Sequence, residues 1–309
     1  ILELEDILDH SKDFTLTHAQ VNQMRNKYLC SSKITGQLYE TPQFMFMRVA
    51  LAVCMFEDEE TRLEKVKKLY KHLSDFHLNL PTPMWTNLGT PFKTGTSCLV
   101  YTVDDNIGSL TAGDHISNIM TVAGAGIGNT IFTRSKKDPI QEGRLEHLGK
   151  IPYYRLLQAN IQATMQSGAR RGAATTYINC LDPEVRTLIH LRNPTSIDEE
   201  RVDDIDYAFS FNNVFAEKVK KNEDWMLISY QTAPDLWKAM YSSDEEFNIL
   251  FDKYKNDQSV KKTIIKARDL AIEFLTEQLE TGRLYEFNCS NANKHTPFNE
   301  PIYGSNLCI

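Results

Sequence analysis

Two cysteines beside hydrogen-bonding side chains are the residues of this chain best suited to chemistry. Cys308 follows Asn306 and Leu307 at the end of the sequence, and Cys98 follows Ser97 about two hundred residues upstream. A thiol is reactive where its surroundings control its ionisation and its contact with oxidants. The pair therefore predicts a thiol site that is assembled by folding, and the sequence would end inside its own active site.

The composition is that of a globular protein and excludes several classes of function. The chain has 309 residues, of which 41% are hydrophobic and 24% charged, and its formal net charge is −7. Non-specific binding to nucleic acid or to anionic lipid needs a basic surface, which this balance does not favour. No apolar run is long enough to span a bilayer, and the first residues do not resemble a signal peptide. We expect a cytoplasmic protein with no DNA or membrane partner.

The six cysteines predict neither a disulfide scaffold nor a metal site. A chain of this length builds its core without covalent staples. The sequence has no Cys-x-x-Cys and no Cys/His pairing at zinc spacing, so we expect no metal. Cys54 lies in an apolar helical segment. We expect it and Cys30, Cys180 and Cys289 to act as small hydrophobic residues.

The first part of the chain, residues 1–90, is predicted to be a helical domain. Thr15 or Thr17 can cap a first helix, and Thr41 followed by Pro42 can open another that continues through an apolar run. A charged helix is expected over 59–75. Two prolines, Pro81 and Pro83, are expected to end the helical pattern.

Residues 91–309 alternate between strand and helix patterns, which predicts an α/β domain with parallel strands. The expected strands are 98–103, 129–133, 173–180, 207–212 and 283–288. The expected helices are 110–122, 153–166, 183–191, 215–221, 233–241 and one long helix over 244–281, with Gly282 as its C-cap.

Two glycine-containing loops have the composition of ligand-binding segments. Residues 124–128 have the pattern GxGxG, but they follow a helix and precede a strand, so a dinucleotide site is not indicated. A tight helix-to-strand turn is the slightly favoured interpretation, although backbone amides there could approach a ligand. Residues 166–175 place Arg170 and Arg171 between glycines, which favours phosphate or base recognition over a solvated basic turn.

Six motifs in a fixed order resemble the catalytic large subunit of class I ribonucleotide reductase. They are Leu80-Pro81-Thr82-Pro83, Ser97-Cys98, Ala125-Gly126-Ile127-Gly128, Arg170-Arg171-Gly172-Ala173-Ala174-Thr175, Thr281-Gly282-Arg283 and Ser305-Asn306-Leu307-Cys308. Single motifs are weak signals, but six in order along nearly the whole chain are specific. The resemblance implies a helical N-terminal domain and the first half of a ten-stranded α/β barrel, with a finger loop that carries a cysteine.

The resemblance also implies an enzyme that reduces ribonucleoside diphosphates to deoxyribonucleotides for DNA synthesis. Cys308 would become a thiyl radical and abstract the 3′ hydrogen of the substrate, and Cys98 would donate hydrogen at the 2′ position and end in a disulfide. Asn306 matches the amide that hydrogen-bonds the substrate hydroxyls. The positions that hold the ribose and the diphosphate are matched by Thr82, Ser97, Ala125 and Gly126.

An allosteric site is implied by the same resemblance. Asp105 matches the acid at the effector's sugar, Arg134 the arginine at its phosphates, and Gln166 and Arg170 the side chains that relay effector identity to the substrate base. The effectors would be dNTPs and ATP, bound at a homodimer interface of helices 109–122 and 153–166. No cofactor would be bound by this chain itself.

The family motif continues Asn-Leu-Cys-x-Glu, and this sequence stops at Ile309. The glutamate that acts as general base, a second redox cysteine and the second half of the barrel are therefore expected on a complementary C-terminal chain. A split gene is the favoured explanation, with an artificially truncated or intein-interrupted piece and a non-catalytic protein as alternatives. Further expected partners are a metal-containing small subunit that supplies the radical, and thioredoxin or glutaredoxin as reductant.

Two other functions stay open from the sequence. One is a non-catalytic homologue that binds nucleotides or scaffolds an assembly, with which Asp105 and the arginine loop are compatible. Cys98 together with Asn306 and Cys308 argues against it. The other is a glycyl-radical enzyme with a similar barrel, which would need a C-terminal glycyl segment.

Overall fold

The computed structural model describes residues 2–32, 34–92, 95–164, 172–196 and 201–307. The chain forms two compact units, and the division between them falls between Ser97 and Cys98. The predicted domain boundary at residues 90 and 91 stays a prediction. Within the described ranges, no helix is both long and apolar enough to cross a bilayer.

The N-terminal unit is helical, as predicted. Its elements are α1 (Leu2–Glu5), η1 (His10–Thr15), α2 (His18–Gln23), η2 (Met24–Tyr28), α3 (Pro42–Val53), η3 (Cys54–Phe56), α4 (Glu59–Ser74) and α5 (Thr82–Asn87). Thr17 forms a capping box with Gln20 at the start of α2, and Thr41 caps α3, where Pro42 stands in the first turn. These side chains bind amides that the first turn leaves unpaired.

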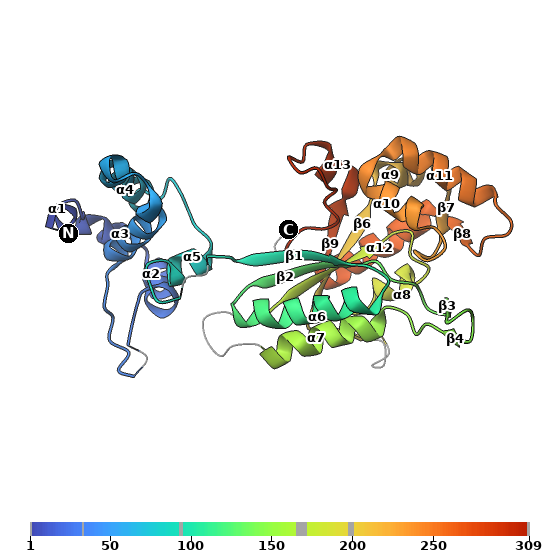
Figure 1. Cartoon of the computed structure of the whole chain (residues 1–309), viewed down its shortest axis with the longest axis horizontal. Coiled ribbons are helices and arrows are strands. Elements are labelled where there is room, and N and C mark those ends of the chain that lie inside the picture. Colours follow the sequence, from blue (N-terminus) through green and yellow to red (C-terminus); the bar gives the residue numbers. More distant parts are fainter. Residues whose placement is uncertain (1, 33, 93–94, 165–171, 197–200, 308–309) are drawn as a thin grey trace. The chain divides into compact units, whose positions relative to one another are not determined.

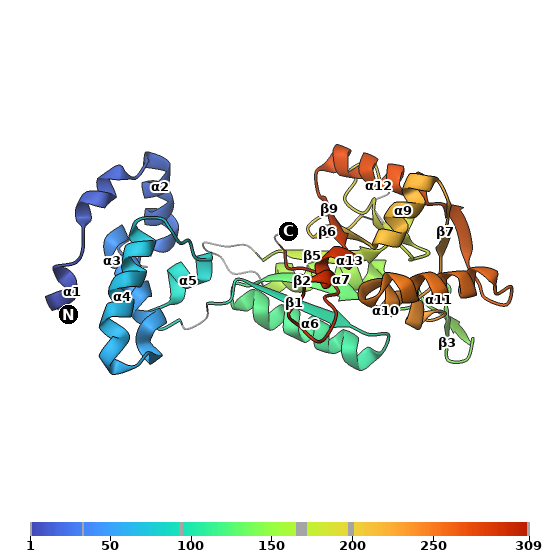
Figure 2. The same ribbon diagram turned by 90° about the horizontal axis from the view of Figure 1, so that it is seen from above.

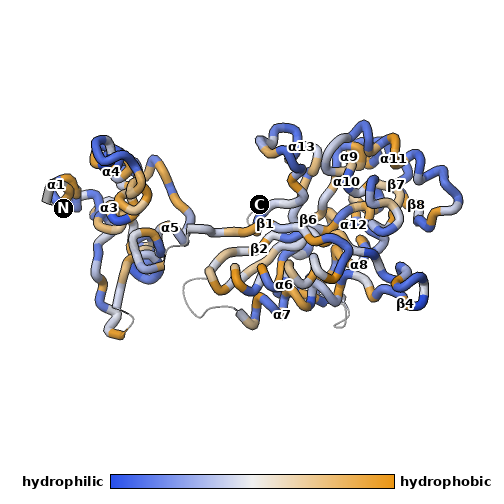
Figure 3. Tube along the Cα trace, in the orientation of Figure 1, coloured by the Kyte–Doolittle hydropathy of each residue, from blue (hydrophilic) through white to orange (hydrophobic). Residues whose placement is uncertain are grey.

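The core of this unit lies between α3 and α4. Phe46, Val49, Tyr70, Leu73 and Trp85 are all buried there. Helix α4 is rich in charged residues and is largely hydrophilic in Figure 3. Burial of one apolar stripe per helix is what holds such a pair together.

The prediction that Pro81 and Pro83 end the helical pattern is wrong in part. They stand at the beginning of α5, with Pro81 at the N-cap and Pro83 in the first turn. Proline is compatible with the first turn because the amide that it lacks would have no partner inside the helix.

The C-terminal unit is built on a five-stranded parallel sheet, which confirms the predicted α/β architecture. The strands lie in the order β1 (Cys98–Val103), β2 (Gly126–Ile131), β5 (Ala174–Asn179), β6 (Asp206–Phe211) and β9 (Leu284–Asn288). Helix α6 (Ile107–Val122) packs against β1 and β2, and α7 (Ile151–Thr164) lies beside α6 along the sheet (Figures 1 and 2). Parallel neighbours need such crossover helices.

The other elements of this unit lie around the carboxyl ends of the strands and beside β9. The helices are α8 (Val185–Leu188), α9 (Asn213–Lys221), α10 (Pro234–Ser242), α11 (Asp244–Asn256), α12 (Ala267–Thr281) and α13 (Cys289–Lys294). Two small antiparallel ribbons pair β3 (Pro139–Ile140) with β4 (Leu145–Glu146), and β7 (Asp224–Leu227) with β8 (Thr263–Lys266).

The long helix predicted over 244–281 is wrong, because the structure divides it into α11, β8 and α12. Asp257 ends the first helix by accepting the amide of Ser259, at 2.9 Å. The β-branched run Thr263-Ile264-Ile265 then pairs with β7, where Ile265 lies opposite the buried Trp225. Gly282 is the C-cap with a positive φ of 64°, as predicted.

The strand predicted over 129–133 begins earlier, at Gly126. Of the three glycines in the GxGxG motif, only Gly124 has the left-handed conformation of a turn, with φ of 83°. Gly126 and Gly128 are extended and pair with Cys98 and Val100 of β1. The glycines of the GxGxG motif therefore belong mostly to the sheet and not to the turn.

Candidate functional site

The last described residues of the chain lie across one face of the parallel sheet. Thr130 of β2 donates its hydroxyl hydrogen to the carbonyl of Tyr303, with 3.1 Å between the oxygens. From β5, Tyr177 Oη donates to the carbonyl of Asn306 at 3.2 Å, and Thr175 Oγ1 to that of Leu307 at 3.3 Å. We call residues 301–307 the C-terminal segment.

Two glycines let this segment lie close to the strands. A Cβ at Gly128 would be 2.9 Å from Cα of Asn306 and would overlap the carbonyl oxygen of Ser305. A Cβ at Gly304 would be 2.9 Å from Thr130 Oγ1 and also from the ring of Tyr177. Real Cβ atoms do not approach that closely, so both positions need a residue without a side chain.

The start of the C-terminal segment is held by Asn293 of α13. Its Oδ1 accepts the amide of Ile302 at 2.6 Å, and its Nδ2 donates to the carbonyl of the same residue at 3.0 Å. Tyr303 packs edge-on against Phe132 and Tyr241, with ring centroids 5.2 and 5.1 Å apart. The path of the chain over the sheet is thus fixed at both ends of its described part.

Cys98 lies on the same face of the sheet as the C-terminal segment. Side chains alternate along a strand, and in β1 Tyr101 and Val103 line the pocket beside α6, so Cys98 and Val100 are on the other face. Val100 pairs with Gly128 and Cys98 with Gly126, which places Cα of Cys98 within about 8 Å of Cα of Gly128. Asn306 is in contact range of that glycine, so the structure brings Cys98, Gly126 and Asn306 into one neighbourhood.

Gly126 is the first residue of β2, and Ala125 directly precedes it. Both are buried, and the amide of Ala125 donates to the carbonyl of Met120 at 2.9 Å. In this structure the Ala125 amide therefore closes the carboxyl end of α6. Gly126 carries no side chain on the face where Cys98 lies, which leaves the backbone of β2 open to close approach.

The remaining predicted substrate positions belong to the N-terminal unit. Thr82 is the first residue of α5, and its carbonyl accepts the hydroxyl of Thr86 at 3.2 Å. Ser97 is the last residue before β1. Cys308 lies outside the described residues, directly after Leu307 in the sequence.

Asp105 and Arg134, predicted as effector residues, form a bidentate ion pair at the carboxyl ends of β1 and β2. Arg134 Nε is 2.9 Å and its Nη2 also 2.9 Å from Asp105 Oδ2. The same carboxylate accepts the hydroxyl of Thr133 at 3.0 Å and the amide of Arg134 at 3.2 Å. Hydrogen bonding to Asp105 raises the pKa of the Arg134 guanidinium. The pair lies at the opposite end of β1 from Cys98, a full strand length away.

Gln166 and Arg170, the other two predicted effector residues, lie outside the described residues, as does the rest of 165–171. Helix α7, which precedes this loop, contacts helix α6, which follows β1. Asn160 of α7 donates to Asp114 of α6 at 3.1 Å. Both helices also carry exposed apolar side chains, namely Ile107, Ile116, Ile119, Val122 and Leu156.

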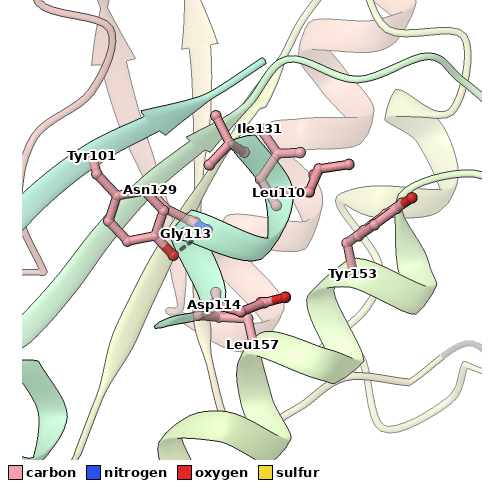
Figure 4. Close-up of a pocket in the computed structure, with 9 residues that line it drawn as sticks. Tyr101, Leu110, Gly113, Asp114, Asn129, Ile131, Tyr153 and Leu157 are labelled. Carbon is pink, nitrogen blue, oxygen red and sulfur yellow. Dashed lines mark hydrogen bonds between the residues drawn. The ribbon is translucent and has the colours of Figure 1, made fainter. Parts of the chain in front are cut away.

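A narrow pocket lies between this helix pair and the sheet (Figure 4), and two of its polar lining residues, Tyr101 and Asn129, bind each other and further groups of the neighbouring elements. Tyr101 Oη and Ser117 Oγ are 2.6 Å apart, and Asn129 Nδ2 donates to Tyr101 at 3.4 Å. Asn129 Oδ1 accepts the hydroxyl of Thr176 at 2.7 Å. This mutual pairing is typical of a packed core and not of a ligand site. Among the described residues, no cluster of His, Cys, Asp and Glu could hold a metal ion.

Sequence reasoning missed the residues that seat the C-terminal segment. The sequence slightly favours a turn at Gly128, and Thr130, Thr175 and Tyr177 have the composition of an ordinary buried strand. The available signal was the spacing of Gly126 and Gly128, because glycines two apart in a strand clear one face of a sheet.

Comparison with known proteins places these features in one family. The model of the ribonucleotide reductase barrel domain matches residues 96–309, and that of the ribonucleotide reductase all-alpha domain matches residues 14–93. Ribonucleoside-diphosphate reductase 1 subunit alpha of Escherichia coli is 34% identical over 99% of this chain and 41% of the relative. The subunit alpha of Enterobacteria phage T4 is 33% identical over 99% of this chain, again with 41% of the relative covered.

The subunit alpha of Haemophilus influenzae is 32% identical, with the same two coverages of 99% and 41%. The chain thus spans about 41% of the length of these curated relatives. The two matched domains coincide with the helical unit and the parallel α/β unit of the structure. The chain therefore belongs to the class I ribonucleotide reductase large-subunit family, of which it carries the N-terminal all-alpha portion and the parallel sheet part of the barrel domain.

Proposed function

We propose that this chain is the part of a ribonucleoside-diphosphate reductase that carries the radical cysteine. The observation that supports this most is the seat of the C-terminal segment, which ends beside Thr175 on the face of the sheet that also bears Cys98. Cys308 is the next residue in the sequence. A radical thiol and a reducing thiol must face one substrate, and the position of Leu307 on the face of the sheet that bears Cys98 supports this pairing.

The proposed reaction begins with a thiyl radical on Cys308, which takes the 3′ hydrogen of a ribonucleoside diphosphate. The 2′ hydroxyl then leaves as water with one proton from the thiol pair, and Cys98 donates the hydrogen that forms the new bond at the 2′ carbon. Cys98 and a second cysteine on the complementary part of the large subunit together supply two electrons and two protons and become a disulfide. Cys308 returns the hydrogen to the 3′ carbon, so the net change is ribonucleotide plus two thiols to deoxyribonucleotide, disulfide and water. Thioredoxin or glutaredoxin would reduce the disulfide, and a metal-containing small subunit would generate the radical.

The proposed role of Asn306 is to bind the ribose hydroxyls, and that of Thr82, Ser97, Ala125 and Gly126 is to hold the ribose and diphosphate. The hydrogen bond from the Tyr177 hydroxyl to the main-chain carbonyl of Asn306 would fix the Asn306 carboxamide next to the thiol. A reacting group that is held in place before substrate arrives needs no further ordering in the transition state.

We further propose that the Asp105–Arg134 pair binds an effector dNTP or ATP, with Gln166 and Arg170 as the relay to the substrate base. The Arg134 side chain is 22% exposed, and its guanidinium can offer an N–H to phosphate while Asp105 keeps the guanidinium plane fixed. The exposed apolar residues on α6 and α7 suit a homodimer interface beside this site.

The test uses the holoenzyme, which contains this chain, the rest of the large subunit and the small subunit. Cys308→Ser and Cys98→Ser should each abolish ribonucleotide reduction, while binding of substrate and of labelled dNTPs survives. Cys54→Ser, a change at a buried thiol of the N-terminal unit, is the matched control and should leave turnover within a few-fold of wild type. Full turnover by the Cys308→Ser complex would end the proposal. Binding of dNTPs with no turnover by the wild-type complex would favour the non-catalytic homologue.

A further inference from the structure

The segment that follows Arg134 is a short hairpin, residues 135–149, which contains β3 and β4. The amide of Lys137 donates to the carbonyl of His147 at 2.9 Å, and the amide of His147 donates to that of Asp138, also at 2.9 Å. Arg134 Nη1 binds the carbonyl of Pro139 in this hairpin at 2.8 Å. The tip near β4 is hydrophilic in Figure 3. Any shift of the hairpin therefore moves the Arg134 guanidinium.

Both ends of the hairpin converge on one carboxylate, that of Glu184 at the N-cap of α8. Glu184 Oε2 accepts the amide of Lys136 at 2.9 Å, and its Oε1 accepts the amide of Lys150 at 3.4 Å. Gly149, with φ of 90°, passes so close that a Cβ there would be 2.9 Å from the carboxyl carbon of Glu184. The position needs glycine for its conformation and for its clearance alike.

A buried ion pair lies under this carboxylate. Lys150 and Asp182 side chains are 2% and 1% exposed and contact each other directly. Lys150 Nζ also donates to the carbonyl of Thr133 at 3.1 Å, and Asp182 Oδ1 accepts the hydroxyl of Ser135 at 3.1 Å. Asp182 further accepts the amide of Glu184 at 2.9 Å. Breaking a buried ion pair whose other hydrogen-bonding groups are also paired costs much free energy. The Lys150–Asp182 pair therefore holds the backbone around Glu184 in place.

We propose that Glu184 is a positioning residue for the effector site, because its carboxylate clasps both ends of the hairpin that holds Arg134. This inference rests on the proposed binding of effector phosphate by Arg134. Glu184 does not touch the nucleotide in this account. Glu184 restricts the conformations of the Arg134 guanidinium before the nucleotide binds. Binding of a triphosphate therefore costs less conformational entropy.

A positioning role of Glu184 can be distinguished from a general contribution to folding. In the first case, the losses of dNTP affinity caused by changes at Glu184 and Arg134 are not additive. If Glu184 acts only through Arg134, then removing the clasp matters only while the guanidinium is present. Residues that share one function show a coupling term in a double-mutant cycle, whereas independent effects on folding add.

The experiment measures the dissociation constant for dTTP, dATP and dGTP with the reconstituted holoenzyme. Glu184→Gln should weaken the tightest of these nucleotides by about tenfold. Arg134→Ala should weaken it further, and adding Glu184→Gln to Arg134→Ala should change it less than twofold. Glu273→Gln, at a glutamate of α12 that is ion-paired with Arg186, is the matched control and should leave affinity unchanged.

A second variant guards against an effect of misfolding. Gly149→Ala crowds the same carboxylate from the hairpin side, so it should lower dNTP affinity while substrate affinity and the thermal midpoint of the helical unit stay close to wild type. Equal affinity of wild type and Glu184→Gln for dNTPs, or additive losses in the cycle, would overturn the role of Glu184. Failure of the wild-type holoenzyme to bind any of the three nucleotides would instead remove the effector site on which the inference rests.

Discussion

The carbonyl oxygen of Ser305 lies where a side chain of Gly128 would have to be. The two residues come from opposite ends of the α/β unit, and their contact lets the C-terminal segment rest directly on the backbone of β2. Thr130, Thr175 and Tyr177 complete the seat with bonds to three carbonyls of that segment. The sheet thus binds its own C-terminal segment, with room left by Gly128 and hydrogen bonds from three hydroxyls.

Gly128→Ala tests whether this contact sets the position of Cys308, the thiol proposed to carry the radical. The added methyl overlaps Ser305 and stands 2.9 Å from Cα of Asn306, so the segment must lift from the sheet. We expect turnover of the reconstituted complex to fall by at least about a hundredfold, since a misplacement of roughly 1 Å has that effect on a positioned reaction. Binding of dNTPs should be retained, because Arg134 lies at the other end of β2.

Gly108→Ala is the control for that substitution. Gly108 stands in the first turn of α6, where the nearest atom to an added Cβ is Asn106 Oδ1 at 3.4 Å. Alanine also has the better helix propensity. Wild-type turnover in both variants would contradict the positioning role of Gly128.

The second prediction concerns the hydroxyl of Tyr177, whose removal should reduce turnover less than Gly128→Ala does. Tyr177→Phe removes the bond to the carbonyl of Asn306 but keeps the ring, which packs edge-on against Phe287 at 5.3 Å. Loss of one such bond costs about 1 kcal/mol, so we expect a decrease in turnover of about fivefold to tenfold. Hydrogen exchange of the amides of 303–307 should accelerate. Tyr254→Phe, which removes an exposed bond to Asp235, should change neither quantity.

The sequence predicted those parts of the fold whose signals are local. Thr17, Thr41 and Pro42 mark helix starts, Gly282 marks a helix end, and the structure has each of them in that place. The sequence did not predict strand β8, because its pairing with β7 is not local and the charged residues before it continue the helical pattern of α11. Tertiary pairing overrides such a pattern and cannot be seen from a window of the sequence.

In the candidate site too, some residues could be predicted from the sequence and others depend on tertiary contacts. The resemblance to a family selected Cys98 and Asn306, and the register of β1 with β2 explains why they are neighbours. Nothing in the local sequence distinguishes Tyr177 from any buried strand tyrosine, because its role depends on a segment that arrives from the far end of the chain. Glu184 is a similar case, since its two partners become neighbours only when the hairpin folds back.

A third prediction concerns the hydrogen-bonded chain that joins α6 to β1, β2 and β5. Tyr101→Phe would leave the Ser117 hydroxyl and the Asn129 amide without this partner in a buried layer. An unsatisfied buried group costs about 1–3 kcal/mol, which in a unit of this size lowers the thermal midpoint by about 2–4 °C per kcal/mol. Calorimetry of the complex measures this. Tyr39→Phe, at a tyrosine that is 67% exposed, is the control, and equal midpoints for the two variants would refute the prediction.

The last prediction is a pH dependence of stability that originates at Glu184. Burial and the neighbouring charge of Asp182 raise the pKa of Glu184 from 4.5 to about 7, against the opposing charge of Lys150 and the two amides that it accepts. A carboxyl whose pKa is higher in the folded state stabilises that state at low pH, and this contribution is lost as the pH rises from about 4.5 through 7. Wild type should therefore lose roughly 1–3 kcal/mol of unfolding free energy relative to Glu184→Gln between pH 5 and pH 8. Denaturant unfolding of both proteins at several pH values measures the difference, and parallel pH profiles would show that Glu184 titrates as an ordinary surface carboxyl.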